Sequence, residues 1–172
     1  MSHNLSFFQN NIVTLTNKQK RRLKKVNTGL RIKEIEPMTK TQERVFNSYY
    51  SGKNIMCHGV AGTGKTFIAT YLATQEVLSN YNDTRSLHII RSVVPTRDMG
   101  FLPGNQREKS KVYEAPYYAI FTELFERGDA YEILKGREIV HFTTTAFIRG
   151  LNITDAVVIV DECQNMTYHE LD

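Results

Sequence analysis

The amino-acid sequence predicts an α/β fold, in which a parallel β-sheet is covered by helices on both faces. Segments whose apolar residues recur with helical spacing alternate along the chain with short segments that are apolar throughout. Continuously apolar strands are typical of parallel sheets, because helices bury both faces of such a sheet. The length of 172 residues suits one domain with a substantial core.

The first predicted helix and the first predicted strand are close together in the chain. After Pro37, the residues Thr39 and Gln42 fit a capping box, in which two side chains satisfy free backbone N–H groups at the start of a helix. We expect this helix to continue to about Tyr50. The apolar segment 54–58, NIMCH, has a glycine on each side and is predicted to be a buried strand.

The remaining elements follow the same alternation. Apolar residues at helical spacing predict a helix over 65–78, and the segment 87–94 is a predicted strand that stops at a proline. A polar stretch with glycine and proline predicts a long loop over 95–111. The later elements are an amphipathic helix over 118–127 that stops near Gly128, and strands over 138–144 and 156–162.

Composition excludes several classes of protein. A hydrophobic share of 41% with mixed charge is ordinary for a globular protein, and no apolar run approaches the ~20 residues that span a bilayer. The N-terminus has no basic segment leading into an apolar one, so it does not fit a secretory signal. The two cysteines, Cys57 and Cys163, lie in apolar strand-like runs, which predicts buried free thiols and a cytoplasmic location.

A basic block explains the net charge of +4. The segment Lys18–Lys25, KQKRRLKK, contains six basic residues and no acidic one. Such a block is a candidate contact for the phosphates of a nucleic acid. The alternative is a solvated arm or a highly charged helix, because clustered charge attracts polyanions whether or not that is its role.

A phosphate-binding motif lies between the first predicted strand and the second predicted helix. Residues 59–66, GVAGTGKT, fit the pattern G-x-x-x-x-G-K-[ST]. Its members are Gly59, Val60, Ala61, Gly62, Thr63, Gly64, Lys65 and Thr66. Glycines let backbone N–H groups surround a phosphate at a helix N-terminus, Lys65 is expected to reach the β- and γ-phosphates, and Thr66 is expected to ligate Mg²⁺. The alternative is a tight strand-to-helix turn with a solvated lysine.

An acidic pair at the end of the last predicted strand complements this P-loop. In AVVIVDECQN, Asp161 is placed to hold Mg²⁺, and Glu162 is placed to orient and deprotonate an attacking water. Gln164 is expected to sense a γ-phosphate. An acidic pair that only faces solvent is the alternative, and it fits less well once a P-loop is present in the same chain.

With these motifs, the chain resembles the PhoH family of P-loop ATPases, whose core is similar to the first motor domain of superfamily 1 helicases. The resemblance extends from Thr39 to Asp172 and includes RSVVPTRDMGFLPGNQREK at 91–109 and TTTAFIRGLNITDAVVIVDE at 143–162. Cys163 stands where the family usually has alanine. The family likeness implies a P-loop NTPase domain with a RecA-like sheet over 37–172, preceded by a basic arm over 1–36.

The same resemblance implies further properties. ATP and Mg²⁺ are the implied cofactors, ATP hydrolysis is the implied activity, and Gln42 corresponds to a helicase glutamine that recognises adenine. The family has another strand and motif after the acidic motif, so the resemblance implies that the sheet is incomplete after the strand that ends at Asp161. We expect these 172 residues alone to aggregate or remain loosely folded, because a central strand would be missing.

The long predicted loop is a second candidate nucleic-acid contact. Between Arg91 and Lys111, basic residues are interleaved with aromatic ones, a pattern that suits single-stranded RNA or DNA. The alternative is that residues 101–103 form a contact between subunits of a homo-oligomer or cover the core.

The histidines do not show the spacing of metal ligands. His58, His88 and His141 alternate with apolar residues in predicted strands, so we expect them to be partly buried and hydrogen-bonded. The only metal predicted is the Mg²⁺ that accompanies a nucleotide.

Three functions therefore remain after the sequence alone. The first is an ATP hydrolase of PhoH type that acts with RNA or single-stranded DNA. The second is a P-loop kinase for a small molecule, against which the pair of Asp161 and Glu162 argues. The third is a nucleotide-dependent binding module without productive hydrolysis.

Overall fold

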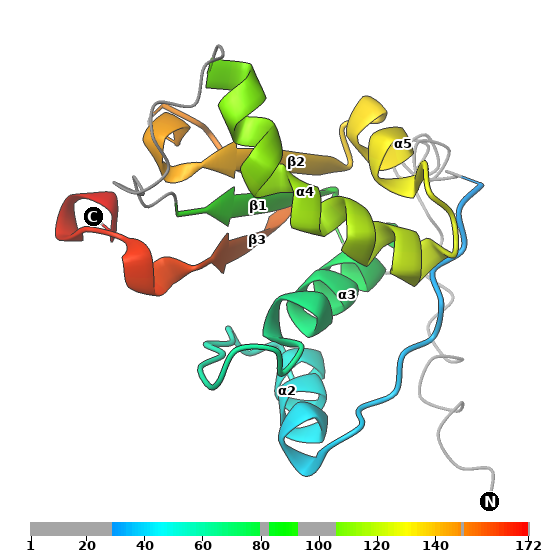
Figure 1. The fold of residues 1–172 in the computed structure, drawn as a ribbon. Coiled ribbons are helices and arrows are strands. Elements are labelled where there is room, and N and C mark those ends of the chain that lie inside the picture. Colours follow the sequence, from blue (N-terminus) through cyan, green and yellow to red (C-terminus); the bar gives the residue numbers. More distant parts are fainter. Residues whose placement is uncertain (1–28, 80–82, 93–105, 149, 172) are drawn as a thin grey trace, which may run out of the picture.

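The computed structural model describes residues 29–79, 83–92, 106–148 and 150–171, and the following statements concern these ranges. In chain order the elements are α2 (Lys40–Tyr50), α3 (Lys65–Leu78), β1 (Ser86–Arg91), α4 (Gln106–Phe125), α5 (Ala130–Gly136), β2 (Val140–Thr144), the 3₁₀ turn η2 (Thr145–Phe147), β3 (Ala156–Asp161), the 3₁₀ turn η3 (Cys163–Asn165) and α6 (Tyr168–Leu171) (Figure 1).

The three strands form a parallel sheet in the order β2-β1-β3. At the carboxyl end of the central strand, Arg91 lies opposite Thr144 of β2 and Asp161 of β3. The parallel sheet flanked by helices confirms the predicted α/β class. Its register brings the carboxyl ends of all three strands together at one edge, where functional residues gather in folds of this kind.

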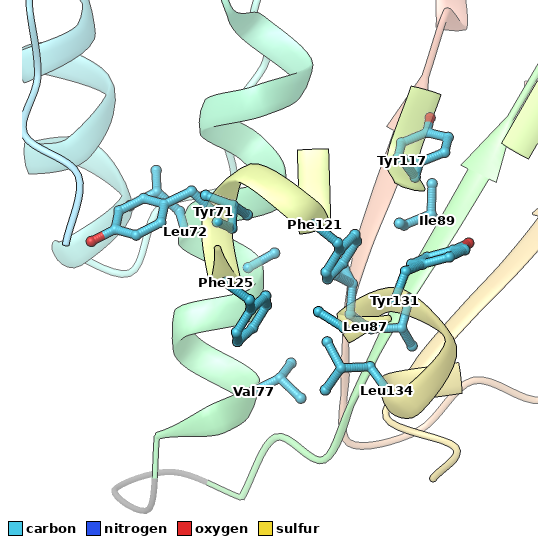
Figure 2. Close-up of a cluster of buried hydrophobic side chains, with 14 of the residues drawn as sticks. Tyr71, Leu72, Val77, Leu87, Ile89, Tyr117, Phe121, Phe125, Tyr131 and Leu134 are labelled. Atoms are coloured by element: carbon cyan, nitrogen blue, oxygen red, sulfur yellow. The ribbon is translucent and has the colours of Figure 1, made fainter. Parts of the chain in front are cut away.

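The hydrophobic core lies between the sheet and helices α3, α4 and α5. Leu87 and Ile89 of β1 are fully buried, and Phe121 of α4 and Leu134 of α5 close over them. Figure 2 shows this cluster, with Tyr117 at one end beside Ile89. The core therefore anchors α4 directly on the central strand.

The two N-terminal helices match the sequence prediction. Thr39 caps α2, since its Oγ1 accepts a hydrogen bond from the backbone N–H of Gln42 at 3.2 Å. Helix α3 has the predicted bounds, Lys65–Leu78. Helix α2 packs on α3 through Phe46, whose ring centroid lies 5.9 Å from that of Tyr71.

The strand predicted over 54–58 is wrong. These residues form no strand, Met56 is 83% exposed, and Cys57 and His58 are exposed as well. A strand needs a neighbour that accepts its backbone hydrogen bonds, and none of the three described strands pairs with these residues. Apolar composition alone could not reveal that the partner is missing from the described sheet.

The burial predicted for the thiols and for β3 also needs correction. Cys57 is exposed and Cys163 is half-buried, although both are free thiols as expected. In β3 the side chains alternate, so that Val158 and Val160 are 43% and 45% exposed while their neighbours are partly buried. Val157 and Ile159 pack against the hydrophobic core, whereas Val158 and Val160 point to the opposite face of the sheet, which explains the alternation.

The middle of the chain contains more helix than predicted. Helix α4 starts at Gln106, so the last residues of the predicted loop are helical, while 93–105 lie outside the described residues. The helix predicted over 118–127 is the second half of α4, which also contains Pro116. Helix α5 was not predicted, because its seven residues give too short an apolar pattern.

Among the described residues, every helix is too short or too polar to traverse a lipid bilayer.

Candidate functional site

The loop 59–66 has the backbone that its glycines were expected to permit. Gly59, Gly62 and Gly64 have φ angles of 145°, 79° and 79°, a region that residues with a side chain rarely adopt. Gly64 is the N-cap of α3. The loop therefore delivers the chain into a helix N-terminus, whose free N–H groups and dipole favour an anion.

The lysine of the loop closes back over it. Nζ of Lys65 donates to the carbonyl oxygens of Gly59 and Val60 at 3.0 and 2.8 Å, and Oγ1 of Thr63 donates to the same Val60 carbonyl at 2.9 Å. The ammonium group of Lys65 is thus hydrogen-bonded to two neutral carbonyl groups of the loop. A phosphate, which carries negative charge, is a stronger partner for it than two carbonyls.

The structure brings the loop and the acidic motif into direct contact. Oγ1 of Thr66, at the start of α3, donates to Oδ1 of Asp161 at 3.1 Å, at the end of β3. A hydroxyl and a carboxylate are hard oxygen ligands of the kind that Mg²⁺ takes, usually together with water and nucleotide phosphates. The two residues predicted as metal ligands fit that ion by their chemistry and by their proximity.

Two further side chains surround Asp161. The hydroxyl of Tyr117 donates to Oδ2 of Asp161 at 2.6 Å, and Nη1 of Arg91 lies 3.6 Å from the same oxygen. Arg91 also approaches the adjacent carboxylate, with Nη2 at 3.9 Å from Oε1 of Glu162. Burial and the hydrogen bond to Asp161 raise the pKa of Tyr117 far above its ordinary value, so it remains a hydrogen-bond donor throughout the physiological range.

Glu162 occupies an unusual backbone position. Its φ and ψ angles are 56° and 34°, in the left-handed region that is rare for residues other than glycine. Nε2 of Gln164 donates to Oε2 of Glu162 at 2.5 Å. The sharp turn after β3 directs the chain into η3 and keeps the predicted base and Gln164 together.

Gln42 lies beside the loop at the start of α2. Its Oε1 accepts the backbone N–H of Met38 at 2.7 Å, completing the cap that Thr39 begins. Its Nε2 would lie 3.9 Å from a Cβ built on Gly64. The amide nitrogen is therefore adjacent to the P-loop, while the amide oxygen is engaged by the helix cap.

The predicted site residues fall into two groups. The loop 59–66, Gln42 and the motif 161–164 converge around the start of α3 and the end of β3. The basic block Lys18–Lys25 and most of the second candidate nucleic-acid contact lie outside the described residues. Of the latter contact, Arg91 faces the acidic pair and Lys111 is exposed on α4.

The sequence interpretation missed two neighbours of Asp161. Arg91 was assigned to a nucleic-acid contact, and the strand predicted over 87–94 placed it inside a strand; in the structure β1 ends at Arg91, beside Asp161. For Tyr117 the sequence gave no signal, because a tyrosine in an amphipathic helix is usually a core residue. Its ring does pack in the core, with its centroid 5.5 Å from that of Phe142.

The histidines of the sheet form a pair away from this motif. His88 and His141 are register partners on β1 and β2, and their rings stack with centroids 4.5 Å apart. Burial, and then repulsion from His141, lower the pKa of His88 below its ordinary 6.5. Among the described residues, no three side chains of histidine, cysteine, aspartate or glutamate are grouped as a metal site.

Comparison with known proteins gives consistent matches. The family profile described as "PhoH-like protein" matches residues 34–172. Over 116 residues the chain is 38% identical to a "PhoH-like protein" of Synechocystis, and over 119 residues it is 37% identical to "Protein PhoH2" of Bacillus subtilis. It is also 34% identical over 116 residues to "Protein PhoH" of Escherichia coli K12.

These alignments cover about two thirds of the chain, namely 67%, 66% and 66% of it. They cover 34%, 26% and 32% of the three relatives, so the chain spans about a third or less of the length of each of these three proteins.

Proposed function

Because this chain belongs to the PhoH family, we propose that it binds ATP together with Mg²⁺ and hydrolyses the nucleotide in a reaction coupled to RNA or single-stranded DNA. The observation that carries the proposal is the contact between Thr66 and Asp161 at 3.1 Å, since it joins a phosphate-binding loop to an acidic strand end. If the loop were only a tight strand-to-helix turn, it would not need the hydrogen bond between Thr66 and Asp161.

The loop residues are proposed to hold the triphosphate. The positive φ angles of three glycines support close approach of the backbone, and Lys65 is proposed to exchange its two carbonyl partners for the β- and γ-phosphates. Gln42 is proposed to contact the adenine through Nε2, because its Oε1 is engaged by Met38. The hydrogen-bonded cap would thereby fix which end of the amide faces the base.

Thr66 and Asp161 are proposed to hold the metal ion. When bound, the metal ion would supply positive charge that offsets the negative charge of the phosphates during the reaction. Glu162 is proposed to accept a proton from an attacking water, and Gln164, which donates to Glu162, is proposed to orient that carboxylate in response to the γ-phosphate.

Coupling to a nucleic acid rests on charge. The block Lys18–Lys25 concentrates six basic residues in a chain whose remainder has a net negative charge. Lys111, exposed on α4, is the other proposed contact. Arg91 is directed to the acidic pair, so we assign it to the nucleotide site rather than to the nucleic acid.

The test is a nucleotide titration followed by a turnover assay. A fluorescent ATP analogue should bind the chain more tightly with Mg²⁺ than with a chelator, and ATP should compete with it better than GTP. Phosphate release should rise when single-stranded RNA or DNA is added. Absence of saturable nucleotide binding would contradict the proposal, and binding without turnover would favour a nucleotide-dependent binding module.

A further inference from the structure

Tyr117 combines a fully buried ring with a hydroxyl group at the candidate site. The residue is 0% exposed, it lies next to Ile89, and its ring packs against Phe142. Figure 2 shows its hydroxyl oxygen pointing away from the cluster of core side chains. A phenylalanine would fill the same volume, so packing alone does not account for the hydroxyl.

The hydroxyl has a specific partner. It donates to Oδ2 of Asp161 at 2.6 Å, while the other oxygen, Oδ1, accepts from Thr66 at 3.1 Å. Nη1 of Arg91 also lies near Oδ2, at 3.6 Å. The two oxygens of the carboxylate therefore have different roles, because one is engaged by the core and the other faces the P-loop.

This division fixes the orientation of the carboxylate. The side chain of an aspartate rotates about two covalent bonds, and a hydrogen bond to each carboxylate oxygen restrains both rotations. Because Tyr117 is itself held by the core, α4 sets the direction in which Oδ1 points. Partners that hydrogen-bond a ligating carboxylate typically contribute 10–100-fold to metal affinity or activity.

We propose that Tyr117 is a positioning residue for Asp161: its hydroxyl holds Oδ2 so that Oδ1 faces Thr66 and the metal ion of a bound nucleotide. The inference rests on the proposed function, since it assigns a purpose to Tyr117 only if Asp161 and Thr66 hold Mg²⁺. It adds α4, a helix outside both sequence motifs, to the metal site.

The experiment compares Tyr117→Phe with Tyr131→Phe. Tyr131 is the matched control, because it is also buried and its hydroxyl also donates to a carboxylate, that of Glu114, at 2.7 Å. The quantity measured is the ratio of ADP dissociation constants in chelator and in Mg²⁺, by calorimetry on the whole 172-residue chain. This ratio reports the metal's contribution to binding and does not require turnover.

In Tyr117→Phe we expect the ratio to fall by about 10-fold or more, with metal-free ADP affinity changed by less than about two-fold. Tyr131→Phe should lower the melting temperature and keep the wild-type ratio. In an Asp161→Asn background, Tyr117→Phe should have no further effect on the ratio.

Two results would overturn the inference. A wild-type ratio in Tyr117→Phe would reduce the hydroxyl to a structural role and leave the proposed function intact. A wild-type chain that binds ADP equally with and without Mg²⁺ would overturn the metal site itself, and the inference with it.

Discussion

The hydroxyl of Thr66 lies 3.1 Å from a carboxylate oxygen of Asp161, although 95 positions separate the two residues in the chain. The contact exists because α3 packs along β3 and because the helix starts where the strand ends. The P-loop and the acidic motif are far apart in the sequence, and the packing of α3 on the sheet brings them together in one site.

Replacing the lysine of the P-loop should weaken nucleotide binding. Lys65→Ala removes the cation that we propose for the β- and γ-phosphates. Hydrogen bonds to charged groups are worth about 1.5–3 kcal/mol, so ATP affinity should fall roughly 10–150-fold. Calorimetric titration measures the ATP affinity. The control is Lys53→Ala, since Lys53 is an exposed lysine that precedes the loop. Equal affinities in the two variants would contradict the assignment.

Replacing the predicted base should separate binding from chemistry. Glu162→Gln retains the shape of the side chain but does not accept a proton, so turnover should fall about 10²–10⁴-fold while ATP binding persists. Phosphate release under saturating ATP measures the effect. Glu126→Gln is a matched control, because Glu126 is another glutamate with a left-handed backbone, at the end of α4. If Glu162→Gln turns over at the wild-type rate, another group is the base.

Neutralising the basic block should reduce the salt dependence of nucleic-acid binding. The changes are to glutamine at Lys18, Lys20, Arg21, Arg22, Lys24 and Lys25. Each lost phosphate contact should lower the slope of log affinity against log salt by about 0.7 for a single strand. Fluorescence anisotropy at several salt concentrations gives the slope. The exposed Lys40 and Lys53, neutralised together, serve as the comparison, and an unchanged slope would assign the block to another role.

The histidine pair should make the fold sensitive to acid. The lowered pKa of His88 means that the folded state binds this proton less readily than the unfolded state does. The free energy of unfolding should therefore decrease as pH falls through 6.5, the ordinary value, and be fully retained above it. Denaturant unfolding at about pH 7.5 and about pH 5.5 tests this.

In His88→Gln the loss of stability between the two pH values should be smaller than in the wild type. His141→Gln should also reduce the loss, because it removes the second cause of the shift. A loss that is identical in all three proteins would show that other groups dominate the acid response.

Much of the fold could be predicted because its signals are local. The capping box at Thr39, the helical spacing after Lys65 and the apolar run before Asp161 each depend on neighbours in the sequence, and the corresponding elements have the expected positions. Parallel pairing also followed from the alternation of strands and helices. The segment 54–58 failed because a strand depends on a partner that its own residues do not specify.

The same distinction applies to the candidate site. The P-loop and the acidic pair were visible as motifs, since their chemistry requires fixed residue types at fixed spacing. Arg91 and Tyr117 reach Asp161 through register and helix packing, which no short pattern encodes. Their roles became apparent only when three strands and α4 were placed together.

The left-handed backbone at Glu162 has a consequence for engineering this protein. A side chain in that conformation costs roughly 1–2 kcal/mol relative to an ordinary one, and glycine avoids most of that cost. Selection of the chain for heat resistance alone should therefore favour glycine at position 162. Glycine at position 162 would lack the carboxylate, so a gain in thermal stability at this residue would come with a loss of turnover.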